Sequence, residues 1–249
     1  MLTPERLKEV AEAAENNFKK PLDLIAIHAE QPVRGTQPRA SLNPFTVMAA
    51  GGTWERLIAD LVGSADSDWK GTGSTKSPDG GVHHPDKVDG YLRNRAFTTG
   101  PVTSRWEAIY PKSWKGATPT RWTTVDGGSD ESERAEFLRH VWGAIAARNA
   151  AAHYALAQNA DVALLKHPSE DSYPWDSDAR TATLQSGYVR GAVALWLQVI
   201  DSTLVAIASD HDWEPDQFRL PADWFGAVSI SSRYQGVEFW GGRALHRIV

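Results

Sequence analysis

Three residues near the middle of the chain have the types and spacing that phosphodiester chemistry needs: Arg148, Asn149 and His153. An imidazole with a pKa of about 6.5 exchanges a proton at neutral pH, and a guanidinium offers a fixed fork of donors to phosphoryl oxygens. RNA carries its own nucleophile, the 2′-hydroxyl, so these groups can cleave it without a metal. Asn149 would orient His153 or bind a phosphate oxygen. The expected products are a 2′,3′-cyclic phosphate and a 5′-hydroxyl.

The longest helical pattern of the sequence must position these residues. Asp130 and Glu133 have the form of a capping box, so we expect a helix to begin near Asp130. Apolar residues then recur with a period of about 3.6 and form one arc. The arc contains Phe137, Val141, Ile145, Ala152 and Ala155, with Leu138 and Leu156 at its edge.

Arg148 falls inside this apolar arc, where an unpaired guanidinium costs several kcal/mol. Glu55 is a candidate partner for its charge; the alternative is that Glu55 faces solvent. On an unbroken helix His153 is turned by roughly 140° away from Arg148, so the two side chains cannot hold one atom together. They can flank a larger group such as a phosphodiester, or converge with their copies across a two-fold axis.

Arg148, Asn149 and His153, followed by a second long apolar helix, resemble the HEPN family of ribonucleases and nucleotide-binding domains. The family signature is an Arg, four to six residues and a His, often with Asn directly after the Arg. The resemblance covers the middle and C-terminal half of the chain. It implies a helical bundle, a homodimer with the site at its interface, and a metal-independent endoribonuclease. It also implies a role as a toxin or antiviral defence effector, with an antitoxin or regulatory partner.

A second pair, Arg134 and His140, has a similar spacing. We prefer the later pair because Asn149 follows its Arg and because Arg134 lies in the solvated first turn of the helix. Some family toxins that pair with a nucleotidyltransferase carry His-x-Tyr, whereas here Tyr154 follows the His directly. This departure argues against modification of the tyrosine by such a partner.

Two further classes of function remain open. In the first, the chain is a non-catalytic HEPN-like module that binds a nucleotide or RNA and signals to a partner; Arg148 would then matter for binding and His153 would not. In the second, it is a Trp-rich protein-interaction or carbohydrate-binding domain. Pairing of Arg148 with a buried acid such as Glu55, away from any cleft, would favour the second class.

Residues 63–128 form the least regular segment, and we expect them to be an insertion or lid within a single domain of residues 1–249. Between residues 87 and 122, seven Lys or Arg residues stand against two acidic residues, with aromatic residues interleaved. This mixture suits single-stranded RNA, although a small aromatic core with a basic surface is the alternative. The candidates for RNA contact are Arg93, Arg95, Arg105, Trp106, Lys112, Trp114, Lys115 and Arg121.

A second group of chemically active residues is His83, His84 and Asp86, around Pro85. These side chains can place two or three metal ligands together, but no second cluster at helical spacing accompanies them. We therefore favour a surface turn and predict no metal and no other cofactor.

Composition limits the function classes. The chain has 249 residues and no Cys, which excludes disulfides and thiol catalysis. Its net charge of −5 shows that it is not a polycation as a whole. No basic region followed by an apolar run opens the sequence, so a cytoplasmic location is the default expectation. The most apolar stretch, residues 191–208, is interrupted by Gln198 and Asp201 and reads as a buried helix, so no membrane contact is predicted.

The remaining pattern predicts a mostly α fold, a helical bundle with the irregular insertion and a small C-terminal hairpin. The helical pattern of residues 4–19 should end at Pro21. Asn43 and Pro44 should start a second helix, which Gly51 and Gly52 kink or split. The third strong helix should span residues 182–208 at the centre of a bundle or in a dimer contact. The hairpin is expected within residues 227–240.

Overall fold

The computed structural model describes residues 1–30, 39–73, 83–106, 186–221 and 224, and the helical positions 138, 141–142, 144–145, 147–149 and 151–152. Its elements are α1 (Pro4–Glu30), α2 (Arg39–Ser64), α3 (Pro85–Asn94), η1 (Thr103–Arg105), α6 (Ser186–Asp210) and η4 (Pro215–Phe218). No strand occurs in these ranges, so the prediction of a mostly α fold is confirmed. The predicted hairpin at 227–240 and the helix start near Asp130 lie outside them.

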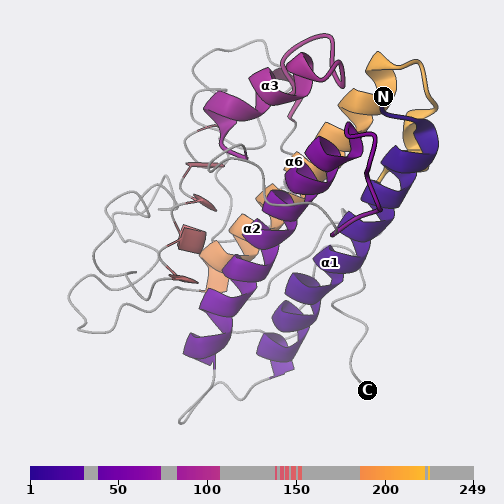
Figure 1. The fold of residues 1–249 in the computed structure, drawn as a ribbon. Coiled ribbons are helices and arrows are strands. Elements are labelled where there is room, and N and C mark those ends of the chain that lie inside the picture. The colour runs from indigo at the N-terminus through magenta and orange to yellow at the C-terminus, as the bar shows by residue number, and fades with distance from the viewer. Residues whose placement is uncertain are drawn as a thin grey trace.

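The long helices α1 and α2 lie side by side, and α6 runs behind α2 (Figure 1). The two front helices are antiparallel, because Arg6 near the start of α1 donates to the carbonyl of Ser64 at the end of α2 at 2.7 Å. The short helix α3 lies across the end of α2 and contacts η1. These helices form a bundle in which α1 and α2 both pack against α6.

Helix α6 is the centre of the core, as its sequence predicts. Every residue from Ala192 to Asp201 is buried, and α6 contacts both α1 and α2. The stretch Ala192–Asp210 is long and apolar enough to span a membrane, with a mean hydropathy of 1.7, and 83% of it is buried inside the fold. Trp54 of α2 stacks on Trp196 at 5.9 Å and meets Trp106 edge-on at 5.7 Å. These rings join α2, α6 and the segment after η1.

Helix α1 continues through Pro21 to Glu30, so the prediction that Pro21 ends this helix was wrong. A proline inside a helix removes one backbone hydrogen bond and costs about 3 kcal/mol. Leu22 and Ile25, just beyond it, are 1% and 3% exposed. Burial of each such side chain stabilises the fold by about 1.5–3 kcal/mol, which offsets the cost of the proline.

Helix α2 begins at Arg39 and is unbroken through Gly51 and Gly52, so the predicted start at Asn43 and the predicted split were wrong. The kink at the two glycines stays a prediction. The two glycines differ in their surroundings. A Cβ at Gly51 would lie 2.9 Å from Cγ and 3.1 Å from Cβ of Arg148. A Cβ at Gly52 would meet no atom of the described chain within 4 Å. Gly51 therefore permits a close helix contact, whereas Gly52 faces open space.

The described part of the 63–128 segment contains α3 and η1 and is fastened to the end of α6. Arg105 donates from both terminal nitrogens to Asp210, at 2.8 and 2.9 Å. The backbone N–H of Thr99 donates to the same carboxylate at 2.6 Å. These bonds hold residues 99–105 against the bundle.

The glycine pair gives a direct test of the helix packing. Gly51→Ala should lower the free energy of unfolding by about 1–2 kcal/mol, because the new methyl group overlaps Arg148. Gly52→Ala should raise it by about 0.5–1 kcal/mol, because alanine replaces a glycine inside a helix without a clash. Urea denaturation followed by tryptophan fluorescence measures both. Equal effects of the two substitutions would contradict this packing.

Candidate functional site

The side chain of Arg148 crosses from the 138–152 segment to α2. Its Nη2 donates to Oε2 of Glu55, and its Nη1 donates to Oδ1 of Asn149 at 2.8 Å. The Arg148 and Glu55 side chains are 29% and 23% exposed. Of the two alternatives for Glu55, the structure has the pairing with Arg148, and neither partner is sealed away from solvent.

Two imidazoles extend this contact. Nε2 of His83 lies 3.3 Å from Oε1 of Glu55, although it is not aligned for a hydrogen bond and has no other partner in the described chain. The ring of His84 lies edge-on to that of His83 at 4.6 Å. Arg148, Asn149, Glu55, His83 and His84 thus form one group, here called the Arg148 cluster. Three segments that are distant in sequence contribute to it.

The fold fixes the two histidines through their backbone. The buried ring of Trp54 donates from Nε1 to the carbonyl of His83 at 2.8 Å. His84 is the N-cap of α3, and Pro85 occupies the first turn, where a missing backbone N–H costs nothing. The His84 ring also packs against Trp142 of the 138–152 segment at 4.8 Å. His83 and His84 therefore lie at the start of α3, where Trp54 contacts the first histidine and Trp142 contacts the second.

Burial sets the protonation of the cluster. It lowers the pKa of His83 from 6.5 to about 4, and the neighbouring charges of His84, Arg148 and Lys87 add to this effect. The pKa of His84 is also lowered, first by burial. Burial raises the pKa of Glu55, while the adjacent Arg148 opposes that change. Both imidazoles are consequently neutral at pH 7 and place no second positive charge beside Arg148.

The structure brings together only part of the predicted site. Arg148 and Asn149 are side by side, whereas His153 lies outside the described residues. His83 and His84 lie in a partly exposed turn just before α3, as predicted, and within it His83 lies against Glu55, the partner of Arg148. In the described chain no group of three or more His, Cys, Asp or Glu has a metal-binding arrangement. The order His83, His84, Pro85 indicates the start of a helix. It contains no signal that predicts the contact with Glu55.

The predicted RNA-binding residues take different places. Arg93 is exposed and donates to the carbonyl of Asp89 at 3.3 Å. Arg95 lies over the ring of Tyr91, 4.8 Å from its centroid. These two cations remain at the surface. Lys112, Trp114, Lys115 and Arg121 lie outside the described residues.

The other two candidates are engaged within the protein. Arg105 is paired with Asp210. Trp106 is 1% exposed and donates from Nε1 to Oγ1 of Thr203 at 3.0 Å. Its ring belongs to the core, which fits the alternative interpretation of these aromatics as a small aromatic core.

No protein-family model, curated protein or solved structure matches this chain. The chemistry of the Arg148 cluster is therefore the basis for inferring function. The cluster combines a forked donor, an amide, a carboxylate and two neutral imidazoles on a partly exposed surface.

The low pKa of His83 predicts a specific loss of stability in acid. Below pH 6.5 the unfolded chain takes up a proton at His83, whereas the folded chain does so only near pH 4. Between pH 7 and pH 5 the wild type should therefore lose about 1–2 kcal/mol more unfolding free energy than His83→Gln. Urea titrations at the two pH values measure this difference. Glu55 shifts stability in the opposite direction in both proteins, so equal losses would contradict the buried, neutral state of His83.

Proposed function

We propose that the protein is an endoribonuclease that cleaves RNA at the Arg148 cluster without a metal. The observation that supports this proposal is the chain of contacts from Asn149 through Arg148 and Glu55 to His83. It places a forked anion donor and an amide at a position that solvent reaches. Internal transfer of a phosphodiester requires such charge stabilisation together with a proton-transfer group.

In this mechanism a phosphodiester takes the place of Glu55 on the fork of Arg148. The 2′-oxygen attacks phosphorus and loses its proton to an imidazole, and the departing 5′-oxygen receives a proton. With a pKa of about 4, His83 is a weak base at neutral pH, so we assign proton transfer to His153. Before the phosphodiester binds, Glu55, which also lies against His83, holds Arg148 in position. The products are a 2′,3′-cyclic phosphate and a 5′-hydroxyl.

The proposal also includes a homodimer. In a symmetric homodimer, His153 of one subunit acts as the base and its mate acts as the acid, with both Arg148 side chains on the phosphate. A toxin or antiviral defence role, with an antitoxin or regulatory partner, rests on the HEPN resemblance, and the cytoplasmic location rests on the sequence pattern of the N-terminus.

A second candidate function is a non-catalytic module that binds RNA, a nucleotide or a protein. The ion pair between Arg148 and Glu55 favours the protein-interaction form of this module, because a satisfied pair that joins two helices also serves as a structural tie. Under this alternative Arg148 matters for binding or stability, and His153 is dispensable.

One assay separates the two functions. Purified protein is incubated with total RNA in excess EDTA beside His153→Ala, Arg148→Ala and the surface control Lys19→Gln, all matched for thermal stability. We expect wild type and the control to cleave RNA equally. His153→Ala should be slower by about 10²–10⁴-fold and Arg148→Ala by about 10²–10³-fold, the usual effects of losing a proton-transfer group and an anion donor.

The ends of the products distinguish the chemistry. A 2′,3′-cyclic phosphate, detected by resistance to phosphatase until acid treatment, is expected. Equal cleavage by wild type and His153→Ala would end the catalytic assignment. Loss of RNA binding in Arg148→Ala, with His153→Ala unchanged in every assay, would establish the binding module instead.

A further inference from the structure

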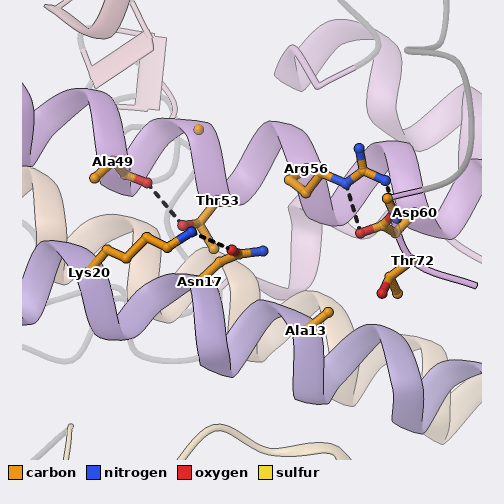
Figure 2. A pocket seen from close by; sticks show the side chains of 10 residues that line it. Ala13, Asn17, Lys20, Ala49, Thr53, Arg56, Asp60 and Thr72 are labelled. Carbon is orange, nitrogen blue, oxygen red and sulfur yellow. Dashed lines mark hydrogen bonds and ion pairs between the residues drawn. The ribbon is translucent and has the colours of Figure 1, made fainter.

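A pocket of about 470 Å³ lies between α1 and α2 (Figure 2), and none of its lining residues belongs to the Arg148 cluster. Its α2 wall includes Ala49, Thr53, Arg56 and Asp60, which recur at helical spacing on one face. Glu55 lies roughly 100° or more around the helix from the centre of that face. The volume is within the range of small-molecule sites in proteins, about 300–1,000 Å³.

One end of the pocket is built on a buried carboxylate. Asp60 is 2% exposed and accepts bonds from Nε of Arg56 at 3.0 Å, from its Nη2, and from the backbone N–H of Gly73 at 2.7 Å. Gly73 has φ +82°, a conformation that glycine adopts without cost, and this lets its N–H reach the carboxylate. Both carboxylate oxygens of Asp60 are therefore engaged, and they pair with the flat Nε–Nη2 edge of Arg56. The remaining Nη1 points away from Asp60 (Figure 2).

The other end of the pocket also presents mainly donors. Nζ of Lys20 donates to Oδ1 of Asn17 at 3.0 Å, which leaves further ammonium protons and the Asn17 amide N–H groups. The hydroxyl of Thr53 already donates to the carbonyl of Ala49 at 2.9 Å. Two cations line the pocket against one carboxylate, and the carboxylate is engaged. A ligand that satisfies these groups must bring acceptors and negative charge.

Gly52 supplies an independent observation. It lies inside a helix, where glycine is less stable than alanine by about 0.5–1 kcal/mol. Packing does not require a glycine there, because a Cβ would meet no atom of the described chain within 4 Å. Gly52 lines the pocket, so its missing side chain keeps that space open.

We propose that the α1–α2 pocket binds a small phosphorylated metabolite, with the phosphate against Lys20 and Asn17. A phosphate fits better than a carboxylate, because the flat edge of Arg56 that would pair with a planar carboxylate already holds Asp60. An ammonium and an amide suit an oxyanion with acceptors in several directions. The rest of the ligand occupies the small-residue part of the pocket beside Gly52 and Ala13.

Calorimetric titration with glycerol 3-phosphate, inorganic phosphate and succinate tests this site. Glycerol 3-phosphate should bind saturably at one site per chain and at least tenfold more tightly than succinate. Lys20→Gln should weaken binding at least tenfold, and Gly52→Leu, which fills the open space, should abolish it. Lys19→Gln is the matched control, because Lys19 is paired with Glu15 and does not line the pocket; it should bind as wild type does.

Three results would overturn the proposal: no saturable binding of glycerol 3-phosphate, unchanged affinity in both Lys20→Gln and Gly52→Leu, or tighter binding of succinate. Thermal denaturation of each variant confirms that it is folded. None of the altered residues belongs to the Arg148 cluster, and His153→Ala should bind the probe as wild type does. The proposal of a phosphate-binding pocket can therefore be supported or refuted independently of the proposed ribonuclease activity.

Discussion

The pairing of Arg148 with Glu55 is the interaction on which the rest of the site depends. Val141, Ala144 and Ile145, one and two turns before Arg148, are buried, so its guanidinium enters an apolar contact that is unfavourable without a counter-charge. Glu55 supplies that charge, and Gly51, one turn earlier on α2, leaves room for the first carbons of the arginine. The pair draws the 138–152 segment onto α2, and the same carboxylate meets His83.

Helix α2 consequently carries two chemically different faces. One face joins the Arg148 cluster, where neutral imidazoles border an ion pair. The other lines the pocket against α1, where donors exceed acceptors. The largely buried α6, whose Trp196 stacks on Trp54, packs against α2, so neither face needs to supply the main core. Polar groups on α2 can therefore serve chemistry and binding on both sides of one rigid element.

Periodicity predicted the features that depend on a single helix. The burial of Val141, Ile145 and most of α6, and the pairing of Arg148 with an acid, follow from residue types at helical spacing. Ala152 of the same predicted arc is only half-buried, and Phe137 and Ala155 lie outside the described residues. The continuation of α1 through Pro21 was missed because tertiary burial of Leu22 outweighs a local preference. The meeting of His83 with Glu55 was missed because it joins distant segments, and no local pattern encodes such a contact. The core position of Trp106 has the same cause: it is set by Thr203 and Trp54, far away in sequence.

The most direct test of the central claim is side-chain NMR of Arg148 and Glu55 during titration with a short single-stranded RNA that carries 2′-O-methyl groups and so cannot be cleaved. If a phosphodiester replaces Glu55 on Arg148, the guanidinium resonances of Arg148 will shift with saturation. The pKa of Glu55, followed by its carboxyl carbon, will rise further as it loses its cationic partner. Arg148 and Glu55 signals that stay unchanged at saturating RNA would contradict the account and leave the pair as a structural tie.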